Sequence, residues 1–396
     1  MPGSIGLETR KVSRIALSGR DFRGVNFELL CQQGDEVQAG AALMRDARRP
    51  SIQFVAPVAG RIASIERGTR RKLNSLQIDV DESIGVVRYQ PPATLDKDSL
   101  REFMLASGAW SSLRTRPFGN IPHPDTEPVA IFVTALDAEP LAPEPRPIID
   151  VFSAEFRAAV DALAGISAAP LYVCQAPGHT LPLGDSSKLR CVSFSKGYSA
   201  GLPGIHINAL CPIGFGGGEV WHLGYQEVIA LGHLLLHASP WLQRVISLGG
   251  NAVKTSRSLC VYPGSAIDEL LAGELHDGSI TVLSGSAVYG RELAVDEAFL
   301  AAGQRQITVQ REALDEAGAG TGVLIPSEAL EELAPPGIYP VPLLRALQVG
   351  DAERARELGA LELVEEDLAP LSMACQSGSD YGVLLRAVLD QLEGLR

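Results

Sequence analysis

The sequence predicts a multidomain α/β protein, and three observations support this fold class. The chain has 396 residues, which exceeds what one hydrophobic core supports, and domains of roughly 50 to 200 residues imply three or four of them. Residues 12–90 are short apolar runs separated by turn residues, which is typical of a β domain. Residues 129–248 alternate strand-like and helix-like segments, and residues 343–396 carry apolar stripes at helical spacing. We therefore expect a β domain, an α/β domain and a helical C-terminal domain.

The first domain is predicted to consist of strands that are too short and too closely spaced for helices. They are Arg14–Leu17, Phe27–Cys31, Ala41–Asp46, Ser51–Val55, Arg61–Ile65 and Leu76–Val80. The segments Gly34–Val37, with Gly40, and Ala56–Gly60 resemble the barrel-sandwich fold of biotinyl and lipoyl carrier domains. A carrier needs a lysine at its hairpin tip, whereas the tip here is Arg48-Arg49-Pro50, and a guanidinium is no acyl acceptor. We expect a structural or docking module.

A helix and a basic, proline-rich loop lead from this domain to the next. Residues 96–110 have helical spacing, with Asp98 or Ser99 as the expected N-cap. Prolines at 117, 122, 124 and 128 keep residues 113–127 extended. Arg114 and Arg116 in this loop either face solvent or cap a helix, or they anchor a carboxylate or a partner protein. We favour anchoring, together with Phe118, and expect both arginines to contribute little to stability.

Residues 129–136 form an almost unbroken apolar run, which predicts a strand covered on both faces. The further expected elements are a helix at Ala154–Leu163, strands at Pro170–Cys174 and Leu189–Phe194, a helix at Gln226–Leu236 and a strand at Arg244–Leu248. Strands that alternate with helices imply a mostly parallel sheet with helices on its faces, as in a Rossmann-like domain.

Two local patterns are candidates for a cofactor or metal site. Gly214, Gly216, Gly217 and Gly218 could expose amides to a phosphate, but position 219 is Glu and the spacing does not match a dinucleotide fingerprint. We prefer a tight turn before the next helix. His233 and His237 share a helical face, but no glutamate lies between them, so we expect histidines at the edge of the core beside Trp241 and no metal. We predict no catalytic residue in this chain.

Charge and cysteine usage exclude several classes of protein. A net charge of -13 argues against a nucleic-acid binder, which needs a basic face. The six cysteines are scattered without a CxxC pair, so we expect buried thiols and no iron–sulfur cluster. We also expect no signal peptide and no membrane-spanning segment, which places the chain in the cytoplasm.

The C-terminal region is predicted to be a small helical bundle divided at Gly350 and Gly378. Its acidic run is expected to form a solvated face. The residues concerned are Glu362, Glu365, Glu366 and Asp367.

Several motifs carry a resemblance to a known family. They are Arg114-Thr115-Arg116-Pro117-Phe118, Ile131 to Asp137, Pro140-Leu141-Ala142, the two glycine-containing segments of the first domain, Glu357 to Leu368 and Tyr381 to Arg386. With these motifs the chain resembles the NqrA family, which belongs to the sodium-translocating NADH:quinone reductases and whose nearest relative is RnfC. The resemblance implies domains at 1–95 (barrel-sandwich), 96–243 (Rossmann-like), 244–300 (β-grasp) and 343–396 (helical), with a shortened connector at 301–342.

The resemblance also implies a function. The chain would be a peripheral cytoplasmic subunit of a sodium pump, bound to the inner membrane through the other subunits, with no activity when isolated. FMN, FAD and iron–sulfur clusters would belong to those partners, quinone is a candidate substrate, and the purified chain should be colourless. The alternatives are an orphan scaffold or electron-transfer adaptor of the same superfamily, and a free-standing flavoenzyme that uses the Gly214–Gly218 loop.

Overall fold

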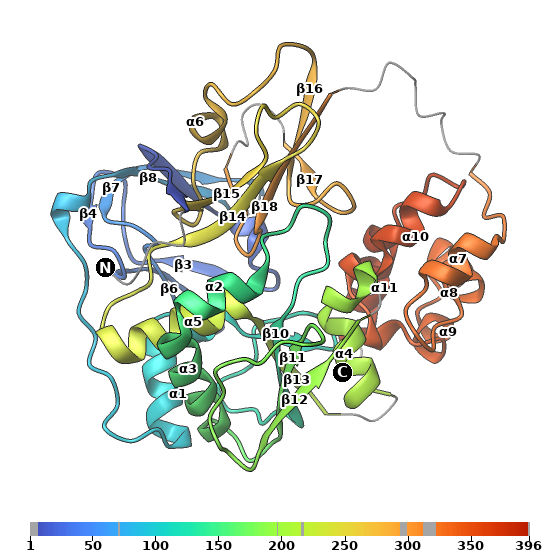
Figure 1. The fold of residues 1–396 in the computed structure, drawn as a ribbon, viewed down its shortest axis with the longest axis horizontal. Helices are drawn as coiled ribbons and strands as arrows, with labels where there is room; N and C mark the ends of the chain where they lie inside the picture. The colour runs from blue at the N-terminus through green and yellow to red at the C-terminus, as the bar shows by residue number, and fades with distance from the viewer. Residues whose placement is uncertain are drawn as a thin grey trace.

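The computed structural model describes residues 7–69, 72–195, 197–214, 218–293, 299–311 and 322–394. Figure 1 shows the N-terminal β unit and a second β-rich unit next to each other, an α/β unit below them and a group of C-terminal helices at one side. In the described residues the strands form sheets of six, five, four and three strands. No helix within the described ranges combines the length and apolar character that crossing a membrane requires.

The N-terminal unit is built from two antiparallel sheets, in the orders β2-β8-β7-β4 and β3-β5-β6. The strands are β2 (Arg14–Ser18), β3 (Phe27–Leu29), β4 (Glu36–Val37), β5 (Ala42–Asp46), β6 (Arg49–Val55), β7 (Gly60–Arg67) and β8 (Leu73–Val80). Alternate residues of β8, such as Leu76 and Ile78, are fully buried, whereas their neighbours are partly or fully exposed. All the strands expected in this domain are confirmed.

The hairpin tip that would carry a prosthetic group in a carrier domain is bonded to the rest of the protein. Arg49 donates from Nε to Asp46 at 2.7 Å and from Nη1 to the carbonyl oxygen of Ile121 in the proline-rich loop at 2.7 Å. The tip therefore attaches the β unit to the α/β unit.

The α/β unit contains a five-stranded sheet in the order β12-β11-β10-β13-β9. Its elements are α1 (Lys97–Ala106), β9 (Arg114–Arg116), β10 (Ala130–Ala135), α2 (Pro145–Val151), α3 (Ser153–Gly165), β11 (Leu171–Gln175), β12 (Leu189–Ser193), α4 (Pro203–Leu210), β13 (Val220–Gly224) and α5 (Tyr225–His237). The first four strands in this order are parallel, and β9 is antiparallel to β13. All six residues of β10 are buried, which confirms the expected fully covered strand.

Three local expectations for this unit are corrected. The N-cap of α1 is Asp96, which accepts from the amides of Asp98 and Ser99, so neither of those two residues is the cap. The glycine cluster is followed by strand β13, not directly by a helix. The predicted strand at 244–248 exists and belongs to the sheet of the third unit, in agreement with the expected domain boundary at residue 244 and not with its assignment to the strands of the α/β domain.

The third unit is a six-stranded sheet in the order β1-β15-β14-β18-β16-β17. Its elements are β1 (Glu8–Thr9), β14 (Arg244–Gly249), β15 (Arg257–Val261), α6 (Ile267–Leu271), β16 (Ile280–Ser284), β17 (Arg291–Glu292) and β18 (Gln306–Arg311). Strand β1 pairs with β15, and β18 pairs with both β14 and β16. The sheet therefore includes strands from both sides of the expected 244–300 range.

The C-terminal helices cover one face of the α/β sheet. They are α7 (Glu328–Leu333), α8 (Pro340–Val349), α9 (Ala352–Glu357), α10 (Ala369–Ala374) and α11 (Tyr381–Gly394), with the short 3₁₀ turns η6 (Ala360–Glu362) and η7 (Glu365–Leu368). Phe132 of β10 belongs to one apolar core with α4 and these helices, whereas Ile131 and Val133 belong to the other core with α1, α3 and α5. Gly350 ends α8 in the left-handed conformation, as expected.

Candidate functional site

A cavity of about 410 Å³ lies at the carboxyl ends of β10 and β13. These two strands flank the point where the strand order reverses, because β11 and β12 follow β10 on one side and β13 lies on the other. In open α/β sheets, ligands bind in the crevice at this point. The position in the fold therefore marks the cavity as the candidate site.

Residues from every unit line this cavity. Its apolar wall includes Leu17 and Phe22 from the N-terminal unit, Leu202, Leu223 and Leu231 from the α/β unit, and Trp241. Its polar lining includes Thr134, Arg114, His222 and Glu139, together with Arg305 from the third unit and Glu366 from the C-terminal unit. An apolar wall with a few converging polar groups is typical of a site for a small organic ligand.

Thr134 near the end of β10 carries a buried hydroxyl group that is not satisfied within the protein. The residue is 4% exposed, and Oγ1 has no hydrogen-bond partner among the described residues. Since buried polar groups normally pair, an unpaired hydroxyl beside a cavity is a candidate ligand contact, but less than 1 Å² of Oγ1 is accessible, so the cavity wall must shift before a ligand atom can reach it.

Arg114 lines the cavity and lies opposite His222 in the antiparallel pair of β9 and β13. Its Nη1 donates to the carbonyl oxygens of Ser111 and Leu113 at 2.7 and 2.9 Å, which fixes the guanidinium against the preceding turn. The structure thus places Arg114 where it can meet a ligand.

Arg116 has a different position, because it is only 2% exposed. Its Nη1 lies 3.1 Å from Nε2 of His222, and its Nη2 lies 3.6 Å from Glu366 and 3.8 Å from Asp367. The chain's own carboxylates hold this arginine, so a solvent-facing role is wrong. Its burial next to the buried Asp367 argues against the expectation that it contributes little to stability, because a buried cation beside a buried carboxylate is costly to remove.

Two of the four residues in the acidic run of the C-terminal unit are buried, whereas Glu365 and Glu366 are partly exposed. Asp367 is 2% exposed and Glu362 is 8% exposed. Burial raises the pKa of Asp367 and the nearby Arg116 opposes this rise, while the carboxylate accepts from the amide of Val364 at 2.8 Å. Glu362 and Asp367 therefore lie in the contact between the C-terminal helices and the α/β unit, which corrects the expected solvated face for these two residues.

His222 is neutral in this environment. Burial, and then the positive charges of Arg116 and Arg114, lower its pKa well below the ordinary value. Since a guanidinium can only donate, Nε2 of His222 accepts from Arg116 and the ring proton resides on Nδ1. The ring therefore presents a neutral donor at the cavity wall.

A network of carboxylates and guanidiniums borders the cavity on the side of the third unit. Arg305 reaches Asp137 at 3.1 Å, and Arg244 reaches Glu227 at 2.6 Å. Glu139, two residues after Asp137, is less well compensated, and burial followed by the charge of Asp137 raises its pKa to about 7. A carboxyl group that stays partly protonated near neutral pH can donate a hydrogen bond to a ligand.

The other candidate residues lie outside this cavity's lining. Phe118 is 6% exposed, and its carbonyl oxygen accepts from Arg23 at 2.7 Å and from Arg386 at 3.0 Å. Of the glycine cluster, Gly216 and Gly217 lie outside the described residues. The amides of Ile213 and Gly214 donate to the carboxylate of Glu362 at 3.1 and 2.8 Å. These two amides are therefore occupied by the chain's own anion.

The two histidines of α5 meet a carboxylate from the neighbouring helix. Nε2 of His237 lies 3.1 Å from Oε1 of Glu155 in α3, and the rings of His233 and His237 have centroids 4.4 Å apart. Trp241 stacks edge-on against Phe152 at 5.2 Å.

The expectation of buried thiols holds for three of the six cysteines. Cys174, Cys260 and Cys375 are buried as expected, whereas Cys31 and Cys211 are half-buried. Cys191 on the edge strand β12 is exposed, which corrects the expectation for that residue.

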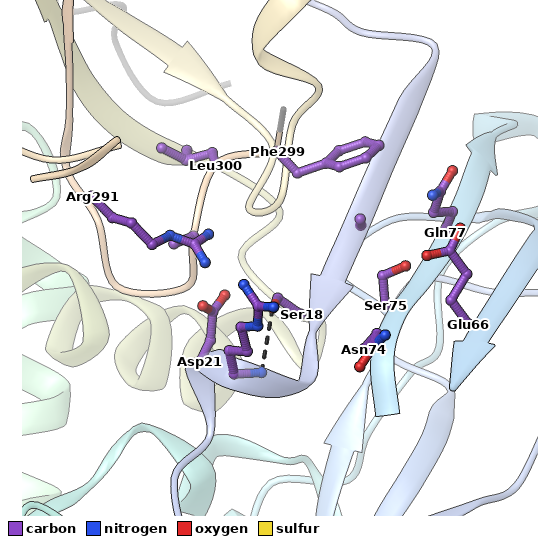
Figure 2. A pocket seen from close by; sticks show the side chains of 12 residues that line it. Ser18, Asp21, Glu66, Asn74, Ser75, Gln77, Arg291, Phe299 and Leu300 are labelled. Atoms are coloured by element: carbon purple, nitrogen blue, oxygen red, sulfur yellow. Dashed lines mark hydrogen bonds between the residues drawn. The ribbon is translucent and has the colours of Figure 1, made fainter. Parts of the chain in front are cut away.

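A second, smaller hollow of about 220 Å³ lies between the N-terminal sheet and the third unit. Figure 2 shows Asp21 and Arg291 facing one another on one side, and Ser75, Asn74 and Glu66 on the other. Asp21 also accepts from the amide of Ala302 at 2.7 Å. Its wall at Phe299 borders residues outside the described part of the chain, so we base no site on it.

Sequence reasoning found Arg114 but missed Thr134, Glu139, His222 and Arg305. The missing signal was strand β13, because the carboxyl ends of parallel strands collect at one edge of a sheet. With β13 assigned, the residues that end β10 and β13 could have been identified as neighbours.

Comparisons with known proteins agree with this architecture. Family models match the NqrA N-terminal barrel-sandwich hybrid domain over residues 2–81, the NqrA second alpha/beta domain over residues 95–239 and the NQRA C-terminal domain over residues 245–294. A chain of the NAD+-reducing [NiFe]-hydrogenase in the air-oxidized state is 13% identical and aligns with a TM-score of 0.42 over 76% of this chain and 62% of its own, which is too weak a likeness to carry an argument.

Curated relatives cover nearly the whole chain. The NqrA protein of the Na(+)-translocating NADH-quinone reductase from Klebsiella pneumoniae (strain 342) is 36% identical over 96% of this chain and 94% of its own length. The corresponding protein from Pseudomonas aeruginosa (strain UCBPP-PA14) is 37% identical over 97% of this chain and 94% of its own length. The corresponding protein from Neisseria meningitidis (strain DSM 15465 / Z2491) is 34% identical over 96% of this chain and 94% of its own length. The chain therefore belongs to the NqrA family of the Na(+)-translocating NADH-quinone reductases.

Proposed function

We propose that this chain is the peripheral NqrA component of a sodium-pumping NADH:quinone reductase and that its cavity binds the quinone headgroup. The proposal includes a cytoplasmic position at the inner membrane, reached through partner subunits, and no flavin or iron–sulfur cluster in this chain. The assignment to the pump is supported by relatives that match 96% or more of the chain and are named as subunits of this reductase. The unpaired hydroxyl of Thr134 in the wall of the cavity carries the assignment of the quinone site.

The chemistry of a quinone fits the lining of the cavity. A quinone ring is flat and apolar, and it has two carbonyl oxygens that accept hydrogen bonds. Leu223 and Trp241 offer apolar surface, while Thr134, Arg114 and His222 offer donors at the strand ends. The cavity volume of about 410 Å³ lies within the usual range for small-molecule sites. We infer that the donors hold one carbonyl oxygen and that the apolar wall holds the ring.

Titration of the purified chain with a short-chain ubiquinone tests this inference. Trp241 lines the cavity, so quinone binding should quench tryptophan fluorescence. Thr134→Val preserves the side-chain shape and should weaken binding by roughly 3- to 10-fold, the effect of one lost hydrogen bond of about 1 kcal/mol. Ser64→Ala is the matched control, because the hydroxyl of Ser64 also has no partner within the described part of the chain, and Ser64 does not line the cavity. Equal affinity for wild type and Thr134→Val would remove the cavity from the proposal.

We further propose that the C-terminal helices contact the other proteins of the complex. Their segment carries many of the exposed large apolar side chains in the described residues, namely Val323, Ile325, Leu333, Tyr339, Val349, Met373 and Val383. Their concentration on one segment supports the proposal, because contiguous exposed apolar patches mark protein interfaces. Val349→Glu with Met373→Glu should reduce co-purification with the other subunits and leave the thermal midpoint of the isolated chain unchanged.

The finer fold assignments are also proposals. The strand order β12-β11-β10-β13 corresponds to the 3-2-1-4 order of a Rossmann-like sheet, which supports that assignment for the α/β unit. The mixed sheet with one short helix, α6, supports a β-grasp-like third unit. The absence of FMN or NADH binding is checked by the absorption spectrum of the purified chain and by titration with both compounds.

A further inference from the structure

We propose that Glu155, His233 and His237 form a binding site for one divalent cation of the zinc class, where helices α3 and α5 cross. Each residue offers one ligand atom, and these atoms all lie within 4.8 Å of one another. Two imidazoles and one carboxylate are a ligand set that zinc takes in proteins. The site is separate from the cavity at the strand ends.

The backbone brings the three ligands together. His233 and His237 are four residues apart on α5 and therefore share one face of the helix. Gly232 lets α3 approach that face closely, since a Cβ atom at this position would lie 1.8 Å from the backbone oxygen of Glu155. The crossing point of the two helices thus delivers Glu155 next to both histidines.

The distances suit one ion. Nε2 of His237 and Oε1 of Glu155 are 3.1 Å apart. Two ligand atoms of a tetrahedral zinc ion with bonds of about 2.0 to 2.1 Å lie about 3.3 Å apart, so this pair can bind one ion with little movement. The ligand atom of His233 lies within 4.8 Å of the other two.

The electrostatic surroundings favour a cation. The side chain of Glu155 is 7% exposed, and its partner His237 is 45% exposed. A buried carboxylate is costly unless a positive charge compensates it. His237 lies in the last turn of α5, where the helix dipole also favours a cation.

His233 is prepared to act as a ligand. His233 lies on the same face of α5 as His237, and its ring is partly buried. Its buried Nδ1 has no hydrogen-bond partner among the described residues. The exposed His237 leaves an open side for water, as expected for a site with three protein ligands.

Zinc binding to the full chain after treatment with a chelator tests the site. Competition with a chromogenic zinc indicator should give one ion per wild-type chain, and cobalt substitution should give a visible d–d spectrum of tetrahedral type. His237→Ala and Glu155→Gln should each weaken zinc binding at least tenfold. His123→Ala is the matched control, because His123 is an exposed histidine beside a carboxylate, Asp125, and should bind as wild type does.

A thermal measurement makes the test decisive. An ion that binds only the folded chain stabilises it, so saturating zinc should raise the thermal midpoint of wild type and of His123→Ala but leave that of His237→Ala unchanged. His237 is exposed, so His237→Ala keeps its fold and carries the test even if His233→Ala does not fold. Absence of saturable zinc binding, or wild-type affinity in His237→Ala and Glu155→Gln, would overturn the proposal.

Discussion

Replacing Arg116 with methionine should destabilise the protein strongly, although the residue belongs to a basic loop with the composition of a surface segment. Methionine keeps most of the apolar volume and removes the charge, which leaves Asp367 buried without its counterion. At 3.8 Å and an effective dielectric constant of about 20, the direct attraction of the two charges is about 4 kcal/mol, which is an upper bound because Asp367 can take up a proton once the arginine is removed. Removing one partner of a buried ion pair costs about 3–5 kcal/mol in other proteins, which agrees with this value.

The assay is the thermal midpoint of unfolding at pH 8, because a chain of several domains does not give a single free energy of unfolding. A loss of about 3 kcal/mol corresponds to a fall of at least roughly 5 °C. The deficit should shrink at pH 5, since Asp367 can take up a proton there and no longer needs a counterion. Its pKa is already raised by burial in the native protein.

Two variants separate this mechanism from a general loss of packing. Arg114→Met is the matched control, because the Nη1 of Arg114 donates to two backbone carbonyl oxygens, and it should cost less than half as much. The double variant Arg116→Met with Asp367→Asn should recover part of the loss, because asparagine keeps an acceptor for the amide of Val364 without the charge. A midpoint for Arg116→Met within 1 °C of wild type, or a deficit that Asp367→Asn does not reduce, would refute the reasoning.

Three further predictions rest on single contacts. The pKa of Glu139 is raised from 4.5 to about 7, so the folded state holds its proton more tightly, and stability on the order of 3 kcal/mol is lost as the pH rises from about 4.5 through about 7. Glu139→Gln should therefore reduce the fall in the thermal midpoint between pH 5 and pH 8, and an unchanged pH profile would contradict this. Gly232→Ala should cost at least about 2 kcal/mol or prevent folding, as measured by circular dichroism and thermal unfolding, because its Cβ would lie 1.8 Å from the backbone oxygen of Glu155. Glu362→Ala should lower the midpoint by the equivalent of about 1–3 kcal/mol, because the amides of residues 213 and 214 lose their acceptor, whereas an unchanged midpoint would mean that solvent replaces the carboxylate.

The sequence was sufficient where a local pattern determines burial. Residues 130–135 are apolar except for Thr134, and the structure buries every one of them between two layers. The strands of the N-terminal unit and the helices α3 and α5 follow from periodicity in the same way. The N-cap of α1 was misplaced by two or three residues, because Asp96, Asp98 and Ser99 are all suitable caps and only the backbone geometry distinguishes them.

The sequence was insufficient where a partner lies far away in the chain. Strand β13 runs into α5 with only Gly224 at the junction, so no turn signal separates the two elements. The run Glu362–Asp367 has the composition of a solvated surface, and nothing nearby reveals that Arg116 and the amide of Gly214 meet it. The burial of Arg116 and of its acidic partner Asp367 is decided by pairing between distant parts of the chain, and not by local propensity.

The arrangement of the site follows from the two faces of β10. Because apolar layers cover both faces of this strand, a ligand can approach it only at an end, and the cavity lies at its carboxyl end, where Thr134 and the following loop emerge. The C-terminal helices complete one of these layers, and their Glu366 both pairs with Arg116 and borders the cavity. Arg116 in turn holds His222 at the cavity wall. The docking of the C-terminal helices and the donor geometry of the cavity therefore depend on the same buried guanidinium, so Arg116→Met should weaken quinone binding as well as lower stability.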